Sequence, residues 1–505
     1  MRALSIRLHR AVAALGGVAL VLWGLSGLLH PVMTTWGPQQ AVFRPPAAEI
    51  DLAGARPLHE TLAAAGIAEA SAVRVLAGER GPLLQVTQDQ HAPRRYFKLD
   101  DGAELPDHDK AHAVFLARHY TGATAPVSDV AFVTEFTADY PWVNRLLPVY
   151  RVRFDREDDL SIYVYTETNA AAGVSNRFKS VVETGFRWVH TWSWFPREAG
   201  WARVVLIGLL VGSAFAAALS GIAMLVLIRR GTRAPGMRGW HRIAGYALAA
   251  PLLMFTASGL YHLLQDVADP PTAALSLSPP IDLRGARFGL TEAWPDIAWG
   301  LDVAAVSIVA DAEGRHLYRL GLAPDRDEGR SAEPTTPAAI RSARFDGVQP
   351  TGPALYLDAR TGEAYPGGDR ELALQLGERF TGAPRGAIED ARLVTRFGMD
   401  YDFRNKRLPV WRLDYGAPVH ASVFVDTTTG VLADRVLERQ KPERVSFSML
   451  HKWGFLRPLG RDAQNVVISA FTVLLVVFAA GMGLALDLKR RRRRPGGRRP
   501  GRRNA

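Results

Sequence analysis

The sequence predicts an α-helical membrane protein in which a bundle of four transmembrane helices carries two α+β external domains. Three observations support this fold class. Four segments are apolar over the length of a bilayer core. The short connections are basic, and the second half of the chain repeats motifs of the first. We therefore expect an internal parallel duplication, with a helix, an external domain and a second helix in each half.

The apolar segments extend over about 10–30, 203–228, 242–263 and 465–488. A helix needs about 20 apolar residues to cross a bilayer core, so each segment is long enough. The 505 residues include no cysteine. Disulfides, thiolate nucleophiles, cysteine-bound iron–sulfur clusters and covalently attached c-type haem are therefore excluded. A metal or cofactor would have to be held by His, carboxylate, Met or Tyr.

Basic residues indicate the orientation in the membrane. The start of the chain, the loop 229–242 and the tail from Lys489 hold 18 of the 61 Lys and Arg, and no Asp or Glu. The positive-inside rule places these stretches and both termini in the cytoplasm, and the two long segments outside. Because the rest of the chain is slightly acidic, the net charge of +11 does not indicate nucleic-acid binding.

The predicted domains follow from these boundaries. They are a cytoplasmic N-terminus with the first span (1–30), a first external domain (31–200), a second span (201–230), a cytoplasmic loop (231–240), a third span (241–263), a second external domain (264–463), a fourth span (464–488) and a basic cytoplasmic tail (489–505).

The duplication is visible as matched motifs. HRAVAALGGVALVLWGLSGLLH (9–30) matches HRIAGYALAAPLLMFTASGLYH (241–262) at an offset of 232. Further along, FRWVHTWSWF (186–195) matches FSMLHKWGFL (447–456) at an offset of 261. The change of offset predicts a 29-residue insertion early in the second half, within 264–350.

The external domains have α+β patterns. Alternating apolar residues predict adjacent antiparallel strands in 147–155 and 160–168, and again in 408–416 and 421–430. Helical periodicity precedes each pair, over 109–122 and 370–382, and residues 356–367 are typical of a strand, a turn and a strand. No Gly-rich nucleotide loop, Ser–His–Asp motif or HExxH helix is present, so the sequence does not support an external peptidase.

Six of the 13 histidines form three pairs related by the repeat, and all six lie at or near a predicted membrane boundary. The pairs are His9 with His241, His30 with His262, and His190 with His451. A single histidine at such a boundary is commonly an amphipathic anchor, but three matched pairs favour a functional role.

Helix geometry indicates what that role is. His9 and His30 are 21 residues apart, which leaves them within about 60° around the helix and roughly 30 Å apart along it. The same holds for His241 and His262. Two such helices facing each other form two bis-imidazole sites, one in each leaflet. Two axial imidazoles in an apolar bundle are what a b-type haem requires.

The sequence offers more than one pair of histidines as ligands of the outer haem site. His190 and His451 precede their spans by about a dozen residues and lie among aromatic residues typical of the membrane interface. They are alternative outer ligands, partners of a haem propionate, or part of an electron exit. We prefer His30 and His262 as ligands because they share helices with the inner pair. Gly16, Gly245, Gly27 and Gly259 lie near the paired histidines and fit haem clearance and close helix packing equally well.

The order of these motifs resembles a known family. The LHR that opens the first helix, the SGLLH that closes it and the LHKWGF before the last helix resemble the PepSY-associated transmembrane proteins, a family that includes bacterial iron-regulated inner-membrane proteins and ferric-siderophore reductases. The resemblance covers almost the whole chain. It implies PepSY-like periplasmic domains, two haem b groups held by His9, His30, His241 and His262, with His190 and His451 as further candidate ligands, and an inner-membrane location.

The function that these features imply is an oxidoreductase that passes electrons across the membrane to a periplasmic ferric siderophore or other ferric chelate. No reductase domain follows Leu488, so quinol or a separate cytoplasmic reductase is the expected electron donor. Two alternatives remain. One is a siderophore or metal transporter, which the spans disfavour because they contain no acidic residue except Asp487 at the end of the fourth. The other is a non-enzymatic PepSY-type regulator, which leaves the paired histidines unexplained.

Overall fold

A computed structural model describes residues 2–89, 91–227, 236–268, 279–324, 334, 336–346 and 351–492. The chain divides into two compact units, each assembled from separate parts of the sequence. The helical unit comprises Met1–Gly37, Lys179–Pro270 and Pro442–Ala505, and the β-rich unit comprises Pro38–Phe178 and Pro271–Lys441. The two long segments expected as separate external domains thus form one unit together.

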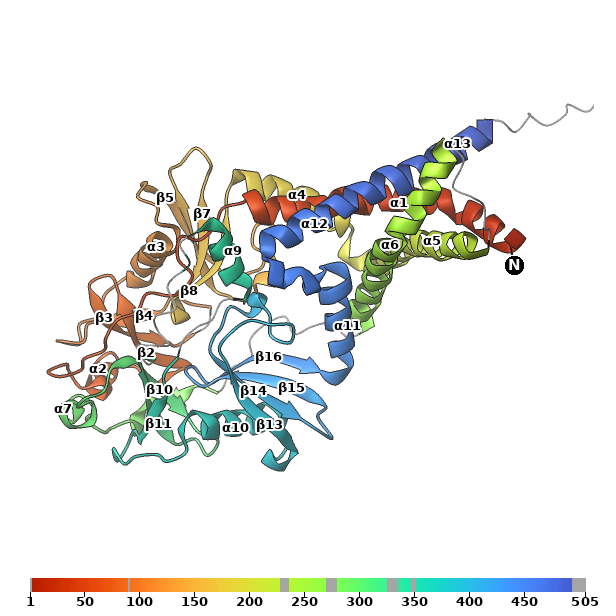
Figure 1. Ribbon diagram of the computed structural model, residues 1–505. Coiled ribbons are helices and arrows are strands. Elements are labelled where there is room, and N and C mark those ends of the chain that lie inside the picture. Colours follow the sequence, from red (N-terminus) through yellow and green to blue (C-terminus); the bar gives the residue numbers. More distant parts are fainter. Residues whose placement is uncertain are drawn as a thin grey trace, which may run out of the picture. The chain divides into compact units, whose positions relative to one another are not determined.

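Four helices of the helical unit are long and apolar enough to cross a membrane, which confirms the four spans expected from the sequence. They are α1 (Arg2–Trp36), α5 (Gly200–Leu227), α6 (Met237–Ala268) and a fourth helix made of α12 (Arg461–Leu474), the π-helical turn η10 (Leu475–Gly481) and α13 (Met482–Arg492) (Figure 1). At most 28% of the most apolar window of any span is buried. The remaining apolar surface is suited to contact with lipid.

Two shorter helical segments also belong largely to the helical unit. These are α4 (Arg177–His190) in the first half, and in the second half α11 (Lys441–Ser446), which continues into the π-helical turn η8 (Phe447–His451). The expected external domains, 31–200 and 264–463, therefore lose their C-terminal parts to the helical unit. The predicted loop 231–240 lies partly outside the described residues, and the tail lies outside them from 493 onward.

The β-rich unit is built around a six-stranded antiparallel sheet to which both halves of the chain contribute. Its order is β12-β11-β10-β2-β3-β4, with β2 and β10 paired at the centre. The strands are β2 (Ala72–Gly78), β3 (Gly81–Thr87), β4 (Arg95–Phe97), β10 (Val303–Ala310), β11 (His316–Leu322) and β12 (Ala354–Asp358). One face covers an apolar core that includes Val73, Val75, Val306 and Ile308.

Each half also contributes a four-stranded antiparallel sheet. The first has the order β5-β6-β7-β8 and the second β13-β14-β15-β16. The strands are β5 (Val127–Val133), β6 (Val149–Phe154), β7 (Ser161–Tyr165), β8 (Ala170–Ser175), β13 (Ile388–Val394), β14 (Val410–Tyr415), β15 (Ala421–Asp426) and β16 (Val431–Leu437). The pairings β6–β7 and β14–β15 confirm the two expected strand pairs.

One helix packs on each four-stranded sheet. α3 (His108–Thr121) places Leu116 in the first core, and α10 (Gly368–Thr381) places Leu372 in the second. Both helices end at a glycine with a left-handed backbone, where φ is 64° at Gly122 and 69° at Gly382. A side chain would be strained in that conformation, so glycine ends the helix there.

The segment 356–367 differs from the expected strand, turn and strand. β12 forms as expected, but its return is reduced to a single bridge between Leu357 and Ala364. The remaining short elements are α2 (Leu58–Ala64), β1 (Glu69–Ala70), β9 (Ile281–Asp282), α7 (Trp294–Ile297), α9 (Pro337–Asp346) and the 3₁₀ turns η1 (Trp142–Asn144), η2 (Thr166–Thr168), η3 (Arg197–Ala199), η4 (Leu283–Gly285), η5 (Arg385–Ala387), η6 (Phe403–Asn405), η7 (Glu438–Gln440) and η9 (Gly454–Leu459). α9 lies within 264–350, where the insertion was expected, although parts of that stretch lie outside the described residues.

Candidate functional site

All six of the repeated histidines belong to the helical unit, and the other seven belong to the β-rich unit. This division separates the two groups by environment. The paired histidines lie on or against the apolar helices, where an imidazole needs a specific partner.

The structure brings His9 on α1 and His241 on α6 close together. Their ring centroids lie 6.4 Å apart, with an angle of 50° between the ring planes. Two imidazoles on opposite sides of one metal ion have centroids about 6 Å apart, because each metal–nitrogen bond is about 2 Å long and each ring centroid lies about 1 Å beyond its nitrogen. The observed spacing therefore fits two axial ligands of a single iron.

The Nδ1 atoms of both rings bond to oxygens of neighbouring spans. Nδ1 of His9 donates to the carbonyl of Ala217 on α5 at 3.0 Å, and Nδ1 of His241 donates to the carbonyl of Phe478 at 3.3 Å. A carbonyl only accepts, so the proton of each neutral ring lies on Nδ1. Nε2 then carries the lone pair that binds a metal.

Phe478 lies in the π-helical turn η10 of the fourth span. Such turns disturb the regular hydrogen bonding of a helix and are frequent at functional sites. Here the turn supplies the carbonyl that holds His241. Glycines of the same helices adjoin the rings, since a Cβ at Gly221 would lie 3.5 Å from Cε1 of His9 and a Cβ at Gly483 would lie 3.3 Å from Cε1 of His241.

A second pair of imidazoles, His190 and His451, is held in the same manner. Nδ1 of His190 lies 3.0 Å from Oγ of Ser26, and Nδ1 of His451 lies 3.2 Å from Oγ of Ser258. Each serine donates its own proton to a carbonyl of its helix, from Ser26 to Leu22 at 2.7 Å and from Ser258 one turn back in α6. The hydroxyl oxygen is left to accept from Nδ1–H, so Nε2 again carries the lone pair.

Burial keeps these two rings neutral. It lowers the pKa of His190 to about 4. Burial also lowers the pKa of His451 to about 3, with a further contribution from the nearby His190. Both rings are outside the spans and are neutral at physiological pH, which is the state that coordinates a metal.

His30 and His262 are each separated from the second pair of imidazoles by one aromatic ring. Phe447 stacks between His262 and His451, with centroid distances of 4.1 Å and 4.8 Å. Phe186 occupies the same place between His30 and His190, at 5.8 Å and 4.7 Å. A phenyl ring therefore separates each of these histidines from the second imidazole pair.

His262 has an acidic partner. Its Nδ1 donates to Oε1 of Glu443 at 2.7 Å, and the His262 side chain is 40% exposed while that of Glu443 is 11% exposed. His262 is therefore an oriented imidazole at the surface of the helical unit. This arrangement does not support the preference for His30 and His262 as the second pair of ligands, and favours His190 and His451.

The four glycines noted in the sequence differ in how closely they are packed. A Cβ at Gly16 would come within 2.8 Å of the backbone of Ser213, and one at Gly245 would touch Leu225. Cβ atoms at Gly27 and Gly259 would each lie 3.6 Å from Cε1 of His190 and His451 respectively. Gly16 therefore allows close helix packing, whereas the distances at the other three glycines are ordinary van der Waals contacts.

Sequence reasoning missed the serines and the separating phenylalanines. Ser26 and Ser258 belong to the repeated SGLLH and SGLYH motifs, and Phe186 and Phe447 open the repeated F-x-x-x-H motifs. Their recurrence at the repeat offsets was a usable signal. Glu443 has no acidic counterpart in the first half, where the equivalent residue is Val182, so the repeat gave no indication of it.

The donor set suits a porphyrin better than a bare ion. Among the described residues, no group of three or more His, Asp or Glu is placed to hold a metal ion. A haem needs only two axial ligands from the protein because the porphyrin supplies the other four. The spacing of His9 and His241 fits that requirement, and His190 and His451 have the same Nδ1 bonding that leaves Nε2 free.

Comparison with known proteins gives no further guidance, since no protein family model and no curated protein matches this chain.

Proposed function

We propose that this protein is a haem b protein of the bacterial inner membrane that passes electrons across the membrane to reduce a periplasmic ferric chelate in iron acquisition, as a ferric-siderophore reductase does. One observation carries the proposal. The helical unit contains two pairs of imidazoles, and all four rings have Nδ1 bound to an oxygen of a neighbouring helix. That pattern leaves four Nε2 atoms available as axial ligands.

The proposal assigns one haem to His9 and His241 and a second to His190 and His451. The first pair follows from the ring spacing of 6.4 Å. The second pair follows from the matched serine bonds and from the electrostatic influence of His190 on His451. His30 and His262 then line the route beyond the second haem.

Haem b would supply one-electron chemistry, because its iron alternates between the iron(III) and iron(II) states. The protein residues orient the imidazoles, keep them neutral and exclude water with apolar helices. One electron reduces the iron(III) of the chelate to iron(II). The hard oxygen ligands of a siderophore hold iron(II) less tightly, so the reduced ion is released.

The same proposal places the β-rich unit in the periplasm and both termini in the cytoplasm, from the positions of the basic residues in the sequence. Alkaline phosphatase inserted near Gly102 should be active, and the same enzyme fused after Ala505 should be inactive. The opposite pattern would refute this topology. Quinol or a cytoplasmic reductase is the proposed electron donor.

The element order supports the proposed duplication and a PepSY-type relationship. Each half of the β-rich unit has three strands in the central sheet, then a helix, then a four-stranded antiparallel sheet. Each half of the helical unit has a span, a helix that ends in a histidine, and a second span.

An optical spectrum of the purified protein, with a pyridine haemochrome assay, tests the central claim. We expect low-spin haem b with two haems per chain. The double variant His9→Ala/His241→Ala should lose one haem, and His190→Ala/His451→Ala should lose the other. The matched control His91→Ala changes an exposed histidine of the β-rich unit and should retain both. A full haem complement in either double variant would refute that site.

A further inference from the structure

A continuous row of polar residues crosses the six-stranded sheet of the β-rich unit. The strand register places one residue from each strand directly beside the next. In sheet order from β4 to β12, the row is Tyr96, Gln85, Arg74, Ser307, Arg319 and Tyr356. Side chains in register on neighbouring antiparallel strands share one face, so all six lie on the face opposite the apolar core.

The two ends of the row are fully bonded. On one side Nε2 of Gln85 donates to the hydroxyl of Tyr96 at 2.7 Å, and that hydroxyl donates to Asp109 at 2.9 Å. On the other side Tyr356 bonds to Asp369, which also accepts from Nε of Arg319 at 2.9 Å. These contacts satisfy buried polar groups that would otherwise destabilise the fold.

The centre of the row is not fully bonded. Nη1 of Arg74 donates to the carbonyl of Glu167, but its Nε is buried without a partner in the described part of the chain, and so is Oγ of Ser307. Nε and Nη2 of Arg319 hold Asp369, and no described residue accepts from its Nη1. Donors on either side of Ser307 therefore remain available.

The electrostatics agree with this geometry. Burial lowers the pKa of Arg74 despite the attraction of Asp426 and Glu167, and Arg407 and Arg319 lower it further. Three guanidinium groups thus influence one another across a small space. Charges in such surroundings need compensation by groups of opposite sign.

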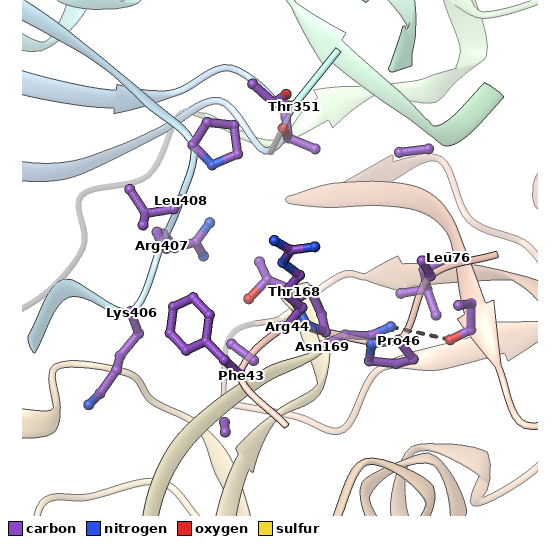
Figure 2. A pocket seen from close by; sticks show the side chains of 18 of the residues that line it. Phe43, Arg44, Pro46, Leu76, Thr168, Asn169, Thr351, Lys406, Arg407 and Leu408 are labelled. Atoms are coloured by element: carbon purple, nitrogen blue, oxygen red, sulfur yellow. Dashed lines mark hydrogen bonds between the residues drawn. The ribbon is translucent and has the colours of Figure 1, made fainter. Parts of the chain in front are cut away.

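A cavity of about 450 Å³ lies over this central part of the row and within the β-rich unit. Its described lining contains five cationic side chains and one carboxylate, which are Arg44, Arg74, Arg319, Lys406, Arg407 and Asp426. Figure 2 shows Arg407 and Leu408 on one side of the cavity and Leu76 and Asn169 on the other. Phe43 and Pro46 add apolar surface to the wall.

Two acids hold Arg407 in place, Asp426 of the cavity lining and Glu167. Its Nη1 donates to Asp426 at 2.7 Å and its Nη2 donates to Glu167 at 3.1 Å. The side chain is only 2% exposed, and its Nε is buried without a partner among the described residues. Arg407 and Arg319 are thus rigid cations, and rigid guanidinium groups recognise oxyanions well because little order is lost on binding.

We propose that this cavity is a binding site for a small organic polycarboxylate, either free or as the ligand shell of an iron(III) chelate, with Arg74 and Arg319 of the row as the contacting residues. The carboxylate oxygens would accept from the unbonded guanidinium groups of the lining. The phenyl and proline surfaces favour an organic body over a bare inorganic anion. The volume lies within the range of about 300–1,000 Å³ typical of small-molecule sites. This site goes beyond the proposed haem function and does not require haem.

Isothermal titration of the full-length protein in lipid nanodiscs tests the site, with citrate and ferric citrate as probes. We expect one saturable site per chain. Arg74→Gln should weaken binding about tenfold or more, because it removes a charged donor from the row. The affinity of Arg74→Lys should lie between those of the wild type and Arg74→Gln, since lysine keeps the charge and lacks the planar fork of donors. The matched control Arg392→Gln removes an exposed guanidinium that is paired with Asp390 outside the cavity, and should bind like the wild type.

Lys406→Gln removes another cation from the cavity lining, gives a second measurement if Arg74→Gln does not fold, and should weaken binding severalfold. Tighter binding of ferric citrate than of citrate would identify the iron chelate as the ligand, and equal or weaker binding would identify the free acid. No saturable binding of either probe, equal binding of inorganic phosphate, or wild-type affinity in all lining variants would overturn the proposal. Haem content measured in the same samples separates the proposed haem function from the proposed binding site in the cavity. Either proposal can fail while the other holds.

Discussion

Arg145 and Asp434 join the two halves of the β-rich unit through a buried ion pair. Nη1 of Arg145, which follows η1, lies 3.3 Å from Oδ2 of Asp434 on β16. The two side chains are 4% and 0% exposed. Arg145 also donates to Asn405, which in turn donates to Asp434 at 3.2 Å. Removing one member of such a pair leaves a charge in a dry environment.

We therefore expect Arg145→Ala to lower the free energy of unfolding by about 3 kcal/mol or more. The control Arg392→Ala breaks a pair whose side chains are 52% and 51% exposed, and should cost less than about 1 kcal/mol. Urea unfolding of both variants, followed by circular dichroism, provides the comparison. Equal losses of unfolding free energy in the two variants would show that burial does not determine how much the Arg145–Asp434 pair stabilises the fold.

Replacement of Ser26 should weaken the second haem site selectively. Ser26→Ala removes the acceptor that orients His190, and loss of such a supporting bond costs about 10- to 100-fold in metal affinity. Ser220→Ala is the matched control at the first site, because His9 keeps its 3.0 Å bond to the Ala217 carbonyl. Haem titration of the apoprotein measures both. A larger effect of Ser220→Ala would contradict the assignment.

Variants of His262 and Glu443 should separate electron exit from haem binding. His262 lies beyond Phe447 and is oriented by the 2.7 Å bond to Glu443. His262→Ala and Glu443→Gln should keep two haems and slow the reduction of ferric chelate in stopped-flow experiments. His30→Ala serves as the comparison for His262→Ala. His30 is the equivalent histidine of the first half, where Val182 takes the place of Glu443. Loss of a haem from His262→Ala would restore His262 as a ligand.

His112 should make the β-rich unit sensitive to acid. Burial lowers its pKa from 6.5 to about 4, although the 2.7 Å bond to Asn169 raises it. The stabilisation that comes from a neutral His112 is complete above pH 6.5 and is lost as the pH falls through 4. A shift of this size corresponds to roughly 3 kcal/mol.

We expect His112→Gln to reduce the loss of stability between pH 6.5 and pH 4, measured as urea midpoints at each pH. His91→Gln, which changes an exposed histidine, should leave the slope unchanged. A wild-type slope in His112→Gln would assign the acid sensitivity to other groups.

The spans and the strand pairs of the small sheets follow from local sequence patterns. Apolar length alone defines the spans, and short connections define pairs such as β6 with β7. The pairing of β2 with β10 joins residues more than 200 positions apart, so no local pattern indicates it. The shared central sheet was therefore not predictable from alternation of apolar residues.

The candidate site shows the same limit. The approach of His9 to His241 follows from the repeat and from helix register. The choice between His30 and His190 depends on where Phe186 packs between two helices, and helical periodicity within one segment does not specify that contact. The serine acceptors lie on spans distant in sequence from the rings they hold.

The pairing of β2 with β10 also bears on how the protein is made. Synthesis proceeds from the N-terminus, so β2 emerges long before β10 exists. During that interval one edge of the incomplete sheet has unpaired backbone amides and carbonyls, which readily pair with strands of other chains. The apolar core beneath it is also incomplete, because it needs residues such as Val306 and Ile308 from the second half. A truncated chain that ends before Val303 should therefore aggregate, and the two halves should fold only when both are present.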